Sequence, residues 1–354
     1  MVLLLAQLSW ASAPAKPTFR QVPVAGANGG ALEKRTTEAH CTLAVTNTLF
    51  TLAGRPTFLL GISYYGGLAA PEDVIRQDLD DIDRIGLNWI RVWANWRAFG
   101  ADAASVDVEG REIPRVMQRL KWLLSECCRH GIVVDVTLSR GDTANGPPQL
   151  ATHEGHRRAV ETLVTVLRPW RNWYLDLSNE RNIRDSRFTS FADLKDLREA
   201  VRALDARRLV TASHGGDISR EELVHYLKEA RVDFLAPHRP RTGESANQTQ
   251  AQMQEYVRWM KELNCAIPVH FQEPFRRGYG KWSPAMTDYL TDVRGAKASG
   301  GAGWCFHNGA ERDTAEGQPR RCFDLRQRRL FDQLDKEERT TLEKLNPEKA
   351  ASLR

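Results

Sequence analysis

Eight short apolar segments, separated by segments of helical period, constrain the fold of this 354-residue chain more than any other feature. The apolar segments start 23 to 44 residues apart, which is the length that a strand, a loop, a helix and a return require. They are residues 58–64, 88–93, 132–138, 173–178, 209–213, 232–237, 267–272 and 301–306. Eight consecutive βα units predict a parallel sheet, and eight strands are the number that closes a (β/α)8 barrel.

The segments between these apolar stretches have the period of amphipathic helices. Ile75, Leu79 and Ile82 lie on one face of the first such segment, and Gly86 follows its end, where helices commonly stop. An open, doubly wound sheet has the same local pattern. We favour the barrel because eight units are present and no G-x-G-x-x-G sequence follows the first apolar segment. The predicted fold is therefore α/β, a (β/α)8 TIM barrel.

One barrel domain is expected to occupy residues 43–338. Its first part, residues 43–45 and 50–52, predicts a short N-terminal β-hairpin at the barrel bottom. The last helix is expected between Phe323 and Leu345, where apolar residues again recur at helical spacing. A charged C-terminal tail is assigned to residues 339–354.

The first 42 residues contain a short apolar stretch but no complete targeting signal. Residues 1–15 end in Ala13-Pro14-Ala15, which resembles a cleavage site, while the positive charges of a signal peptide are missing. We interpret them as a signal peptide or a disordered leader, and residues 16–42 as an N-terminal extension. A signal peptide would make the protein secreted or periplasmic, and otherwise a cytoplasmic location is expected. No stretch approaches 18 apolar residues, so no membrane span is expected.

Charge and cysteine content argue against several classes of protein. Fifty Lys and Arg residues against 45 Asp and Glu residues give a formal net charge of +5, which is small for this length and predicts no nucleic-acid partner. The six cysteines show no C-x-x-C spacing, and no metal or other cofactor is expected. Most are interpreted as buried thiols, with one or two disulfides if the protein is exported. A monomer is expected.

Polar residues concentrate at the carboxyl ends of the predicted strands, where barrels of this kind carry their functional groups. Glu180 ends the fourth strand and Glu273 the seventh. Two carboxyl groups flanking a bond are what glycoside hydrolysis requires, because one protonates the leaving oxygen and the other attacks the anomeric carbon. A separation of roughly 5 to 5.5 Å predicts a retaining route. The acid needs a raised pKa, whereas the nucleophile must stay ionised, as an adjacent Arg91 would ensure.

The alternation of side chains along a strand predicts which residues face the barrel interior. On the fourth strand, the inward face carries Asp176, Ser178 and Glu180, while Leu175 and Leu177 face the helices. On the seventh strand, the face that carries Glu273 also carries Phe271. The pattern therefore places His270, and the following glutamine, against the helices.

Four segments carry a family resemblance. They are FLLGISYYGG in the first strand, GLNWIRVW in the second, WYLDLSNE in the fourth and PVHFQEP in the seventh. Together they resemble the clan A glycoside hydrolases, most closely the cellulase-like group typified by glycoside hydrolase family 5. The resemblance runs from about Phe50 to Leu334, and the Asn-Glu pair of the fourth strand is its most specific motif. It implies a retaining hydrolase acting on a β-linked oligo- or polysaccharide.

The resemblance also implies roles for single residues. Glu180 would be the acid/base and Glu273 the nucleophile. Asn179 would bond the sugar 2-hydroxyl, and Arg91 would keep the nucleophile ionised. Trp304, in the eighth strand, would form an aromatic platform under the sugar.

One departure from the family pattern concerns the sixth strand. His238 matches a histidine that the family often carries there, but Pro240 stands where a tyrosine usually contacts the nucleophile. The expected substitutes are Tyr64, Tyr65 or Arg239. The histidine common in the family's third strand is missing as well.

Two further residues are candidates for substrate binding. Trp93, two positions after Arg91, could stack on a sugar ring, since pyranose faces present C–H groups to aromatic faces. His214 ends the fifth strand, where it either lines the site or bonds a loop. The sequence does not distinguish cellulose, mannan, xylan or smaller β-glycosides as the substrate.

Two other functions fit parts of the sequence. A metal-dependent amidohydrolase barrel would use Glu180, His214 and His238 as ligands, but the first strand lacks the H-x-H pair and the eighth strand lacks the aspartate that such a site needs. A non-catalytic carbohydrate-binding barrel would keep the sugar site without turnover. The presence of both glutamates argues against it, and the missing tyrosine argues for it.

Overall fold

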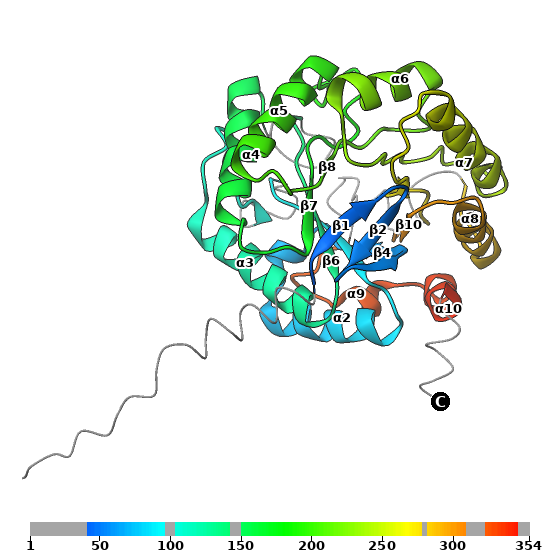
Figure 1. Ribbon diagram of the computed structural model, residues 1–354. Coiled ribbons are helices and arrows are strands. Elements are labelled where there is room, and N and C mark those ends of the chain that lie inside the picture. Colours follow the sequence, from blue (N-terminus) through cyan, green and yellow to red (C-terminus); the bar gives the residue numbers. More distant parts are fainter. Residues whose placement is uncertain (1–40, 96–102, 142–149, 278–281, 309–322, 346–354) are drawn as a thin grey trace, which may run out of the picture.

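The computed structural model describes residues 41–95, 103–141, 150–277, 282–308 and 323–345. Seven parallel strands form one curved sheet, which helices surround (Figure 1). Their order in the sheet is β8 (Val210–Thr211), β7 (Trp173–Asp176), β6 (Val133–Thr137), β5 (Trp89–Trp93), β4 (Leu59–Ser63), β10 (Gly303–Phe306) and β9 (His270–Phe271). Strands consecutive in the chain lie side by side from β4 to β8, as in a barrel built from βα units.

The segment at residues 232–237 joins the two ends of this sheet without forming a regular strand. Pro237 pairs in a parallel bridge with His214, just after β8, and Leu235 pairs with Val269, just before β9. The backbone N–H of His214 donates to the segment and closes the ring on that side. The structure is therefore an α/β barrel, as the spacing of the apolar segments predicts.

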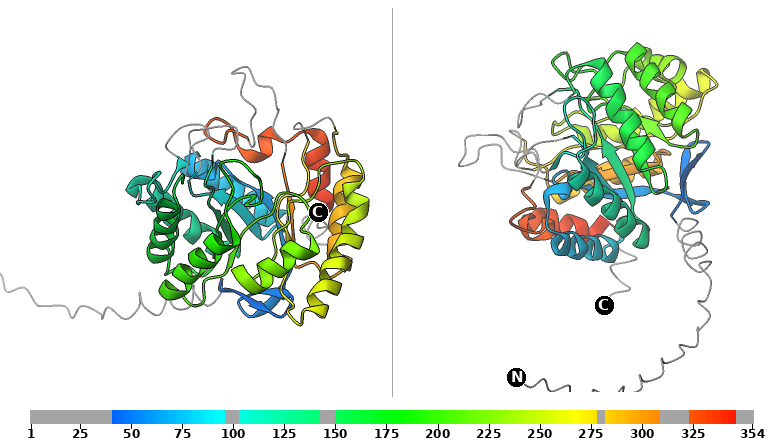
Figure 2. Two further views of the ribbon diagram at one scale, coloured as in Figure 1. Left: turned by 90° about the horizontal axis from the view of Figure 1, so that it is seen from above. Right: turned by 90° about the vertical axis from the view of Figure 1, so that its left-hand side faces the viewer.

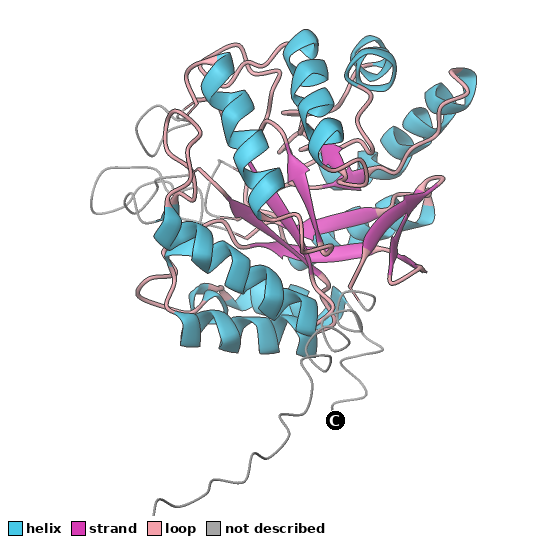
Figure 3. Ribbon diagram, turned by 60° about the vertical axis from the view of Figure 1, so that its left-hand side comes forward, coloured by secondary structure: helices cyan, strands magenta, loops and turns pink. Residues whose placement is uncertain are grey.

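Helices alternate with the strands and cover the outside of the sheet (Figures 2 and 3). They are α2 (Glu72–Arg84), α3 (Pro114–Arg129), α4 (His153–Val166), α5 (Phe191–Leu204), α6 (Arg220–His225), α7 (Ser245–Glu262), α8 (Met286–Ala298), α9 (Leu330–Gln333) and α10 (Lys336–Leu345), with short turns η1 (Gly67–Ala69) and η3 (Tyr226–Ala230). On α2, the apolar residues Ile75, Leu79 and Ile82 are fully buried on the predicted inner face, while Glu72 and Asp73 are exposed. Among the helices in these ranges, none has the length and apolar character needed to cross a membrane.

The C-terminal part of the barrel differs from the single helix expected between Phe323 and Leu345. Two helices, α9 and α10, occupy this part of the chain. Leu334 between them has extended backbone, and the Asp335 side chain accepts a hydrogen bond from the backbone of Glu338 at 2.8 Å. An aspartate at this position starts a new helix rather than continuing the old one. α10 continues past residue 338 and buries Leu342.

A small antiparallel sheet precedes the barrel. It consists of β1 (Leu43–Thr46), β2 (Leu49–Leu52) and β3 (Arg55–Thr57), with β2 in the centre. Phe50 on β2 is fully buried, and its ring meets that of Phe234 at a centroid distance of 5.0 Å. This contact joins the small sheet to the apolar interior of the barrel.

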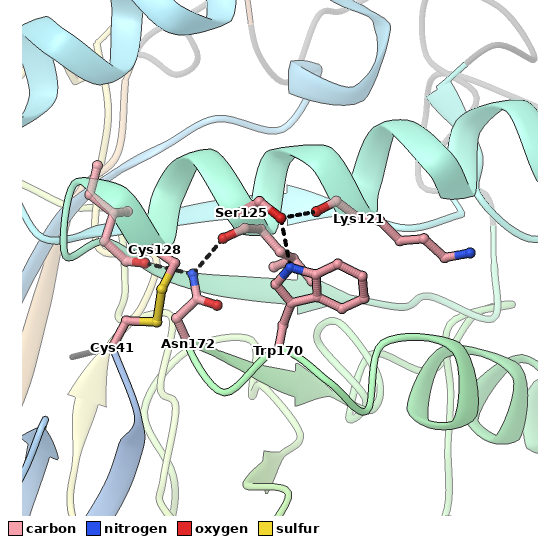
Figure 4. Close-up of a disulfide and its surroundings, with 8 residues drawn as sticks. Cys41, Lys121, Ser125, Cys128, Trp170 and Asn172 are labelled. Carbon is pink, nitrogen blue, oxygen red and sulfur yellow. Dashed lines mark hydrogen bonds between the residues drawn. A yellow bond between two sulfur atoms is a disulfide. The ribbon is translucent and has the colours of Figure 1, made fainter. Parts of the chain in front are cut away.

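A disulfide between Cys41 and Cys128 attaches the chain before β1 to the end of α3 (Figure 4). The two Cα atoms lie 5.5 Å apart, and the bond joins positions 87 residues apart in sequence. Cys127 and Cys305 are buried free thiols and Cys265 is a half-buried one, whereas Cys322 lies outside the described residues. The interpretation of the cysteines as thiols with one or two disulfides fits this arrangement.

Replacing Cys128 by serine is expected to lower the free energy of unfolding by about 2 to 5 kcal/mol. The bond closes a long loop, and opening it increases the conformational entropy of the unfolded chain. Urea unfolding of the oxidised wild type and the variant measures the change. Cys265→Ser serves as the control, because it removes a thiol that forms no disulfide. Equal unfolding free energies for wild type and Cys128→Ser would contradict the prediction.

Candidate active site

Arg91 is the centre of a polar network inside the barrel. It points inward from β5, and its side chain is fully buried. Its Nη2 donates to Asp176 Oδ2 at 2.8 Å and to Asn179 Oδ1 at 2.9 Å. Its Nη1 donates to Glu273 Oε2 at 2.8 Å. Since a guanidinium does not lose its charge, a buried arginine requires such partners, and Arg91 thereby fixes Asn179 and Glu273 relative to each other.

Glu273 receives contacts from three further parts of the barrel. Tyr65, after β4, donates its hydroxyl to Oε2 at 2.6 Å. Arg241, after the sixth-strand segment, donates Nη2 to Oε1 at 2.5 Å. His307, after β10, lies with Nε2 3.4 Å from Oε1. The carboxylate is thus held on both oxygens by residues from opposite sides of the ring.

The side chains around β9 differ from their predicted orientation. The ring centroids of His270 and Trp89 lie 4.6 Å apart inside the barrel, and Gln272 is fully buried in the interior polar network. Phe271 instead packs in the core shared with the helices. The prediction is wrong because the regular strand ends at Phe271, so the alternation does not extend to Glu273.

Glu180 follows β7 in a strained backbone conformation. Its φ of +46° lies in the left-handed region, which costs a residue other than glycine about 1 to 3 kcal/mol. The Ser213 hydroxyl accepts its backbone N–H at 3.0 Å. On the side chain, Arg187 Nη1 donates to Oε2 at 2.6 Å, and His238 Nδ1 lies 3.3 Å from Oε1. The strained turn therefore directs the carboxyl group toward the centre of the ring.

The two glutamates converge, as the sequence predicts. One oxygen of Glu180, one oxygen of Glu273 and a ring nitrogen of His238 all lie within 4.8 Å of one another. Arg241 Nη2 contacts both carboxylates, at 2.5 Å from Glu273 and 3.7 Å from Glu180. Two carboxyl groups this close can act on the same glycosidic bond from opposite sides.

The basic groups of the site lower the pKa of both carboxyl groups and favour their ionised forms. Burial raises the pKa of Glu180, but the hydrogen bond from His238 and the charges of His238 and Arg241 outweigh it and lower this pKa to about 2. Burial likewise opposes ionisation of Glu273, but the charges of Arg241 and Arg91, which bond its two oxygens, hold its pKa well below its usual range. Because burial lowers the pKa of His307 well below its usual range, we attribute this effect to the guanidinium groups rather than to the His307 ring. The raised pKa expected for an acid at Glu180 is therefore not found.

The same residues do not fit a metal site. Glu180, His238 and Glu273 are the one group of three possible metal ligands among the residues that the structure describes. The guanidinium groups of Arg187 and Arg241 already bond their oxygens at 2.6 and 2.5 Å. An added cation would lie against two positive charges, so this donor set favours no metal.

Trp93 lies against Arg91 and Tyr65, which bond Glu273, and His238 lies beside both glutamates. The Arg91 guanidinium carbon lies 5.8 Å from the Trp93 ring centroid, and the centroid of the Tyr65 ring also lies 5.8 Å from it. His238 Nε2 lies 3.2 Å from Gln272 Oε1, which holds the histidine between the interior network and Glu180. Of the three suggested substitutes for the missing tyrosine, Tyr65 is the one that contacts the predicted nucleophile.

Trp304 lies away from the site, so its predicted role as a platform is wrong. It is fully buried in the core between sheet and helices, and its Nε1 donates to Asp292 Oδ2 of α8 at 2.6 Å. The inward positions of β10 belong to Gly303 and Cys305, which places Trp304 on the outer face. His307 takes the inward position at the end of this strand.

Two more predicted residues also face the helices. The Tyr64 hydroxyl donates to Asp78 Oδ2 of α2 at 2.9 Å, because the inward position after β4 belongs to Tyr65. His214 Nε2 lies 3.2 Å from Glu222 Oε2 on α6. It therefore bonds a helix, whereas the predicted alternatives were a place in the site or a bond to a loop, and the amidohydrolase ligand set is not assembled.

Three residues at the glutamates were not predicted. His307 continues the inward alternation of β10 and was recognisable from that pattern. Arg187 and Arg241 belong to the loops after the fourth and sixth strands, and charge in a loop is ordinarily solvated. Strand alternation carries no information on such loop residues, so only the three-dimensional structure reveals them.

No protein-family model matches the sequence, and neither does any curated protein. The three-dimensional structure, in contrast, is similar to solved structures of glycoside hydrolases. A family 5 mannosidase from Rhizomucor miehei has a TM-score of 0.63 at 11% identity, over 89% of this chain and 99% of that protein. The protein has the fold of the glycoside hydrolase barrels. The predicted resemblance to clan A is confirmed at this level.

Two other structures extend the comparison. An endo-1,4-β-mannanase from Rhizomucor miehei has a TM-score of 0.56 at 13% identity, over 75% of this chain and 89% of that one. A candidate glycoside hydrolase from Bacteroides vulgatus has a TM-score of 0.60 at 14% identity, over 77% of this chain. The chain spans 55% of the length of that Bacteroides protein. At these identities the similarity establishes the fold alone.

Proposed function

We propose that the protein is a retaining glycoside hydrolase that cleaves β-linked oligo- or polysaccharides by a double displacement. The observation that carries the proposal is the convergence of Glu180 and Glu273, with oxygens no more than 4.8 Å apart, at the carboxyl ends of barrel strands. Fold similarity to glycoside hydrolases supports it.

Glu273 is the nucleophile in this proposal. It attacks the anomeric carbon and forms a covalent glycosyl-enzyme, which water then hydrolyses. Arg91 and the Tyr65 hydroxyl hold its Oε2 at 2.8 and 2.6 Å, which keeps the carboxylate ionised and oriented. Asn179, fixed by the same guanidinium, is placed to bond a sugar hydroxyl next to the anomeric carbon.

Glu180 is the acid/base. It donates a proton to the leaving oxygen in the first step and removes one from water in the second. Because its neighbours lower its pKa to about 2, Glu180 takes up this proton as substrate binds in the proposed mechanism. Substrate that excludes water and separates Glu180 from its basic neighbours favours the protonated form.

Arg187→Gln is expected to move the alkaline limb of the pH profile of kcat, measured at saturating substrate, upward by about one pH unit or more, because this profile reports the pKa of Glu180 in the substrate complex. Arg187 lies 2.6 Å from Glu180 and favours its ionised form, so removing the charge raises the pKa of the acid. Activity requires protonated Glu180, and it is therefore retained to a higher pH in the variant. Initial rates between pH 3 and pH 9 would measure the shift. An unchanged or lowered alkaline limb would argue against Glu180 as the acid.

The mannosidase and mannanase of Rhizomucor miehei lead us to propose β-mannan as the first polysaccharide to test. Mannan, cellulose and xylan are incubated with the protein, and NMR follows the configuration of the first sugar released. A retaining enzyme releases the β-anomer before mutarotation. An α-anomer would indicate inversion, and no release from these or from neutral and charged aryl β-glycosides would contradict the proposed function.

We also propose that the protein works in an oxidising compartment. The disulfide between Cys41 and Cys128 supports this location, since such bonds are rare in a reducing cytoplasm.

A further inference from the structure

Two arginines that the family resemblance does not include lie directly on the glutamates. Arg187 Nη1 bonds Glu180 at 2.6 Å, and Arg241 Nη2 bonds Glu273 at 2.5 Å. Arg241 is anchored as well through Nε, which donates to the Pro274 carbonyl at 3.2 Å. It also lies 3.7 Å from Glu180, so one guanidinium contacts both proposed catalytic groups.

Arg241 is also the most accessible of these four charged side chains. It is 29% exposed, compared with 13% for Arg187, 12% for Glu180 and 7% for Glu273. A sugar that approaches Glu273 from solvent therefore meets a guanidinium. A guanidinium matches the paired oxygens of a carboxylate or sulfate by two charge-assisted hydrogen bonds, which a neutral hydroxyl cannot provide.

Among the residues that the structure describes, the cations beside the two glutamates exceed what a neutral sugar requires. One cation, Arg91, is enough to keep the nucleophile ionised, and the acid should hold a proton. Arg187 and Arg241 instead add positive charge beside Glu180 and favour its ionised form. This arrangement opposes hydrolysis of a neutral glycoside, but it suits a substrate that brings a negative charge of its own.

We propose that Arg241, assisted by Arg187, binds an anionic group of the sugar, a carboxylate or a sulfate, and that the substrate is therefore a charged glycoside. This inference rests on the proposed glycosidase function and specifies its substrate class. The anionic group competes with the two glutamates for the guanidinium groups. Once the substrate engages Arg241, the hold of this cation on Glu180 weakens, so the substrate promotes protonation of the acid that cleaves it.

The test compares matched pairs of neutral and charged sugars. Hydrolysis of 4-methylumbelliferyl β-D-glucoside is compared with that of the β-D-glucuronide and of the glucoside 6-sulfate, which separates carboxylate from sulfate. Calorimetric titration with mannose and mannuronic acid, and with glucose, glucuronic acid and glucose 6-sulfate, measures binding independently of turnover. We expect a charged member to exceed its neutral counterpart at least about tenfold in kcat/KM and in affinity. Added salt should reduce this preference.

Variants of Arg241 assign the preference to this side chain. Arg241→Gln should reduce the ratio of charged to neutral kcat/KM at least about tenfold, and Arg241→Lys should restore part of it, because lysine keeps the charge without the planar fork. Arg220→Gln, at an exposed arginine paired with Glu262, is the matched control and should keep the wild-type ratio.

The outcomes separate this inference from the proposed function. If every charged sugar is hydrolysed with a kcat/KM equal to or lower than that of its neutral counterpart, the inference is overturned and the proposed glycosidase function stands. Preferential binding of a charged sugar without hydrolysis of any substrate overturns the glycosidase and supports anion recognition. If the protein shows neither hydrolysis nor a charge preference, both the inference and the proposed function are overturned. A preference that persists in Arg241→Gln would show that this arginine is not the recognising group.

Discussion

Replacing Glu273 by glutamine is expected to reduce kcat by roughly 10⁴-fold or more, which corresponds to about 5.5 kcal/mol of transition-state stabilisation. Glutamine has nearly the same shape, but its amide cannot form the glycosyl-enzyme that a double displacement requires. Arg91, Tyr65 and Arg241 would still surround the position, so the loss would follow from missing nucleophilic chemistry. Steady-state rates on the substrate with the highest activity measure it.

A second carboxylate provides the control for this variant. Glu222→Gln changes a partly exposed residue paired with His214, away from the two converging glutamates, and should leave kcat within about twofold. Glu273→Gln leaves the buried Arg91 with one charged partner fewer, which could destabilise the fold. Circular dichroism therefore checks that this variant is folded. A folded Glu273→Gln protein with activity near that of wild type would exclude Glu273 as the nucleophile.

The sequence predicts the barrel, and the end of the barrel at which the two glutamates lie, because both follow from the spacing of the strands. Apolar segments at βα spacing determine the order of strands, and the carboxyl ends of parallel strands meet at one end of a barrel. The expectation that Arg91, on β5, lies beside Glu273 is met, since its Nη1 donates to Glu273 Oε2 at 2.8 Å. The fold can thus be predicted without an alignment of related sequences.

Prediction of single side chains fails where the strands end. β9 stops at Phe271 and β7 stops at Asp176, so the residues that follow obey turn geometry rather than a period of two. The positive φ of Glu180 is one result, and the inward turn of Glu273 is another. The Trp304 prediction came from family resemblance and conflicted with the alternation of its own strand, in which Cys305 faces inward.

The electrostatics of the site were the least predictable part. An acid with a raised pKa follows from mechanism, but the protonation state of Glu180 depends on the nearby guanidinium groups of Arg187 and Arg241, which come from two different loops. No local sequence pattern encodes such a contact. The charge state therefore depends on tertiary packing of loops, whereas the fold depends on periodic burial.

Glu180→Ala should separate general acid catalysis from simple positioning. We expect kcat/KM to decrease about 10²- to 10⁴-fold on glycosides with poor leaving groups, because these need a proton on the departing oxygen. The 2,4-dinitrophenolate group leaves without that proton, so the first step on a 2,4-dinitrophenyl glycoside should be much less affected. Hydrolysis of the glycosyl-enzyme should then become slow, since no base activates water.

Azide provides the deciding measurement for Glu180→Ala, because it is an anionic nucleophile that needs no base. It should enter the space left by the removed carboxylate, beside Arg187 and His238, and release the sugar as a β-glycosyl azide. Rescue of turnover with this product identifies Glu180 as the acid/base of a retaining mechanism. Equal losses on both leaving groups, without rescue, would mean instead that Glu180 positions Arg187 and His238 while another group transfers the proton.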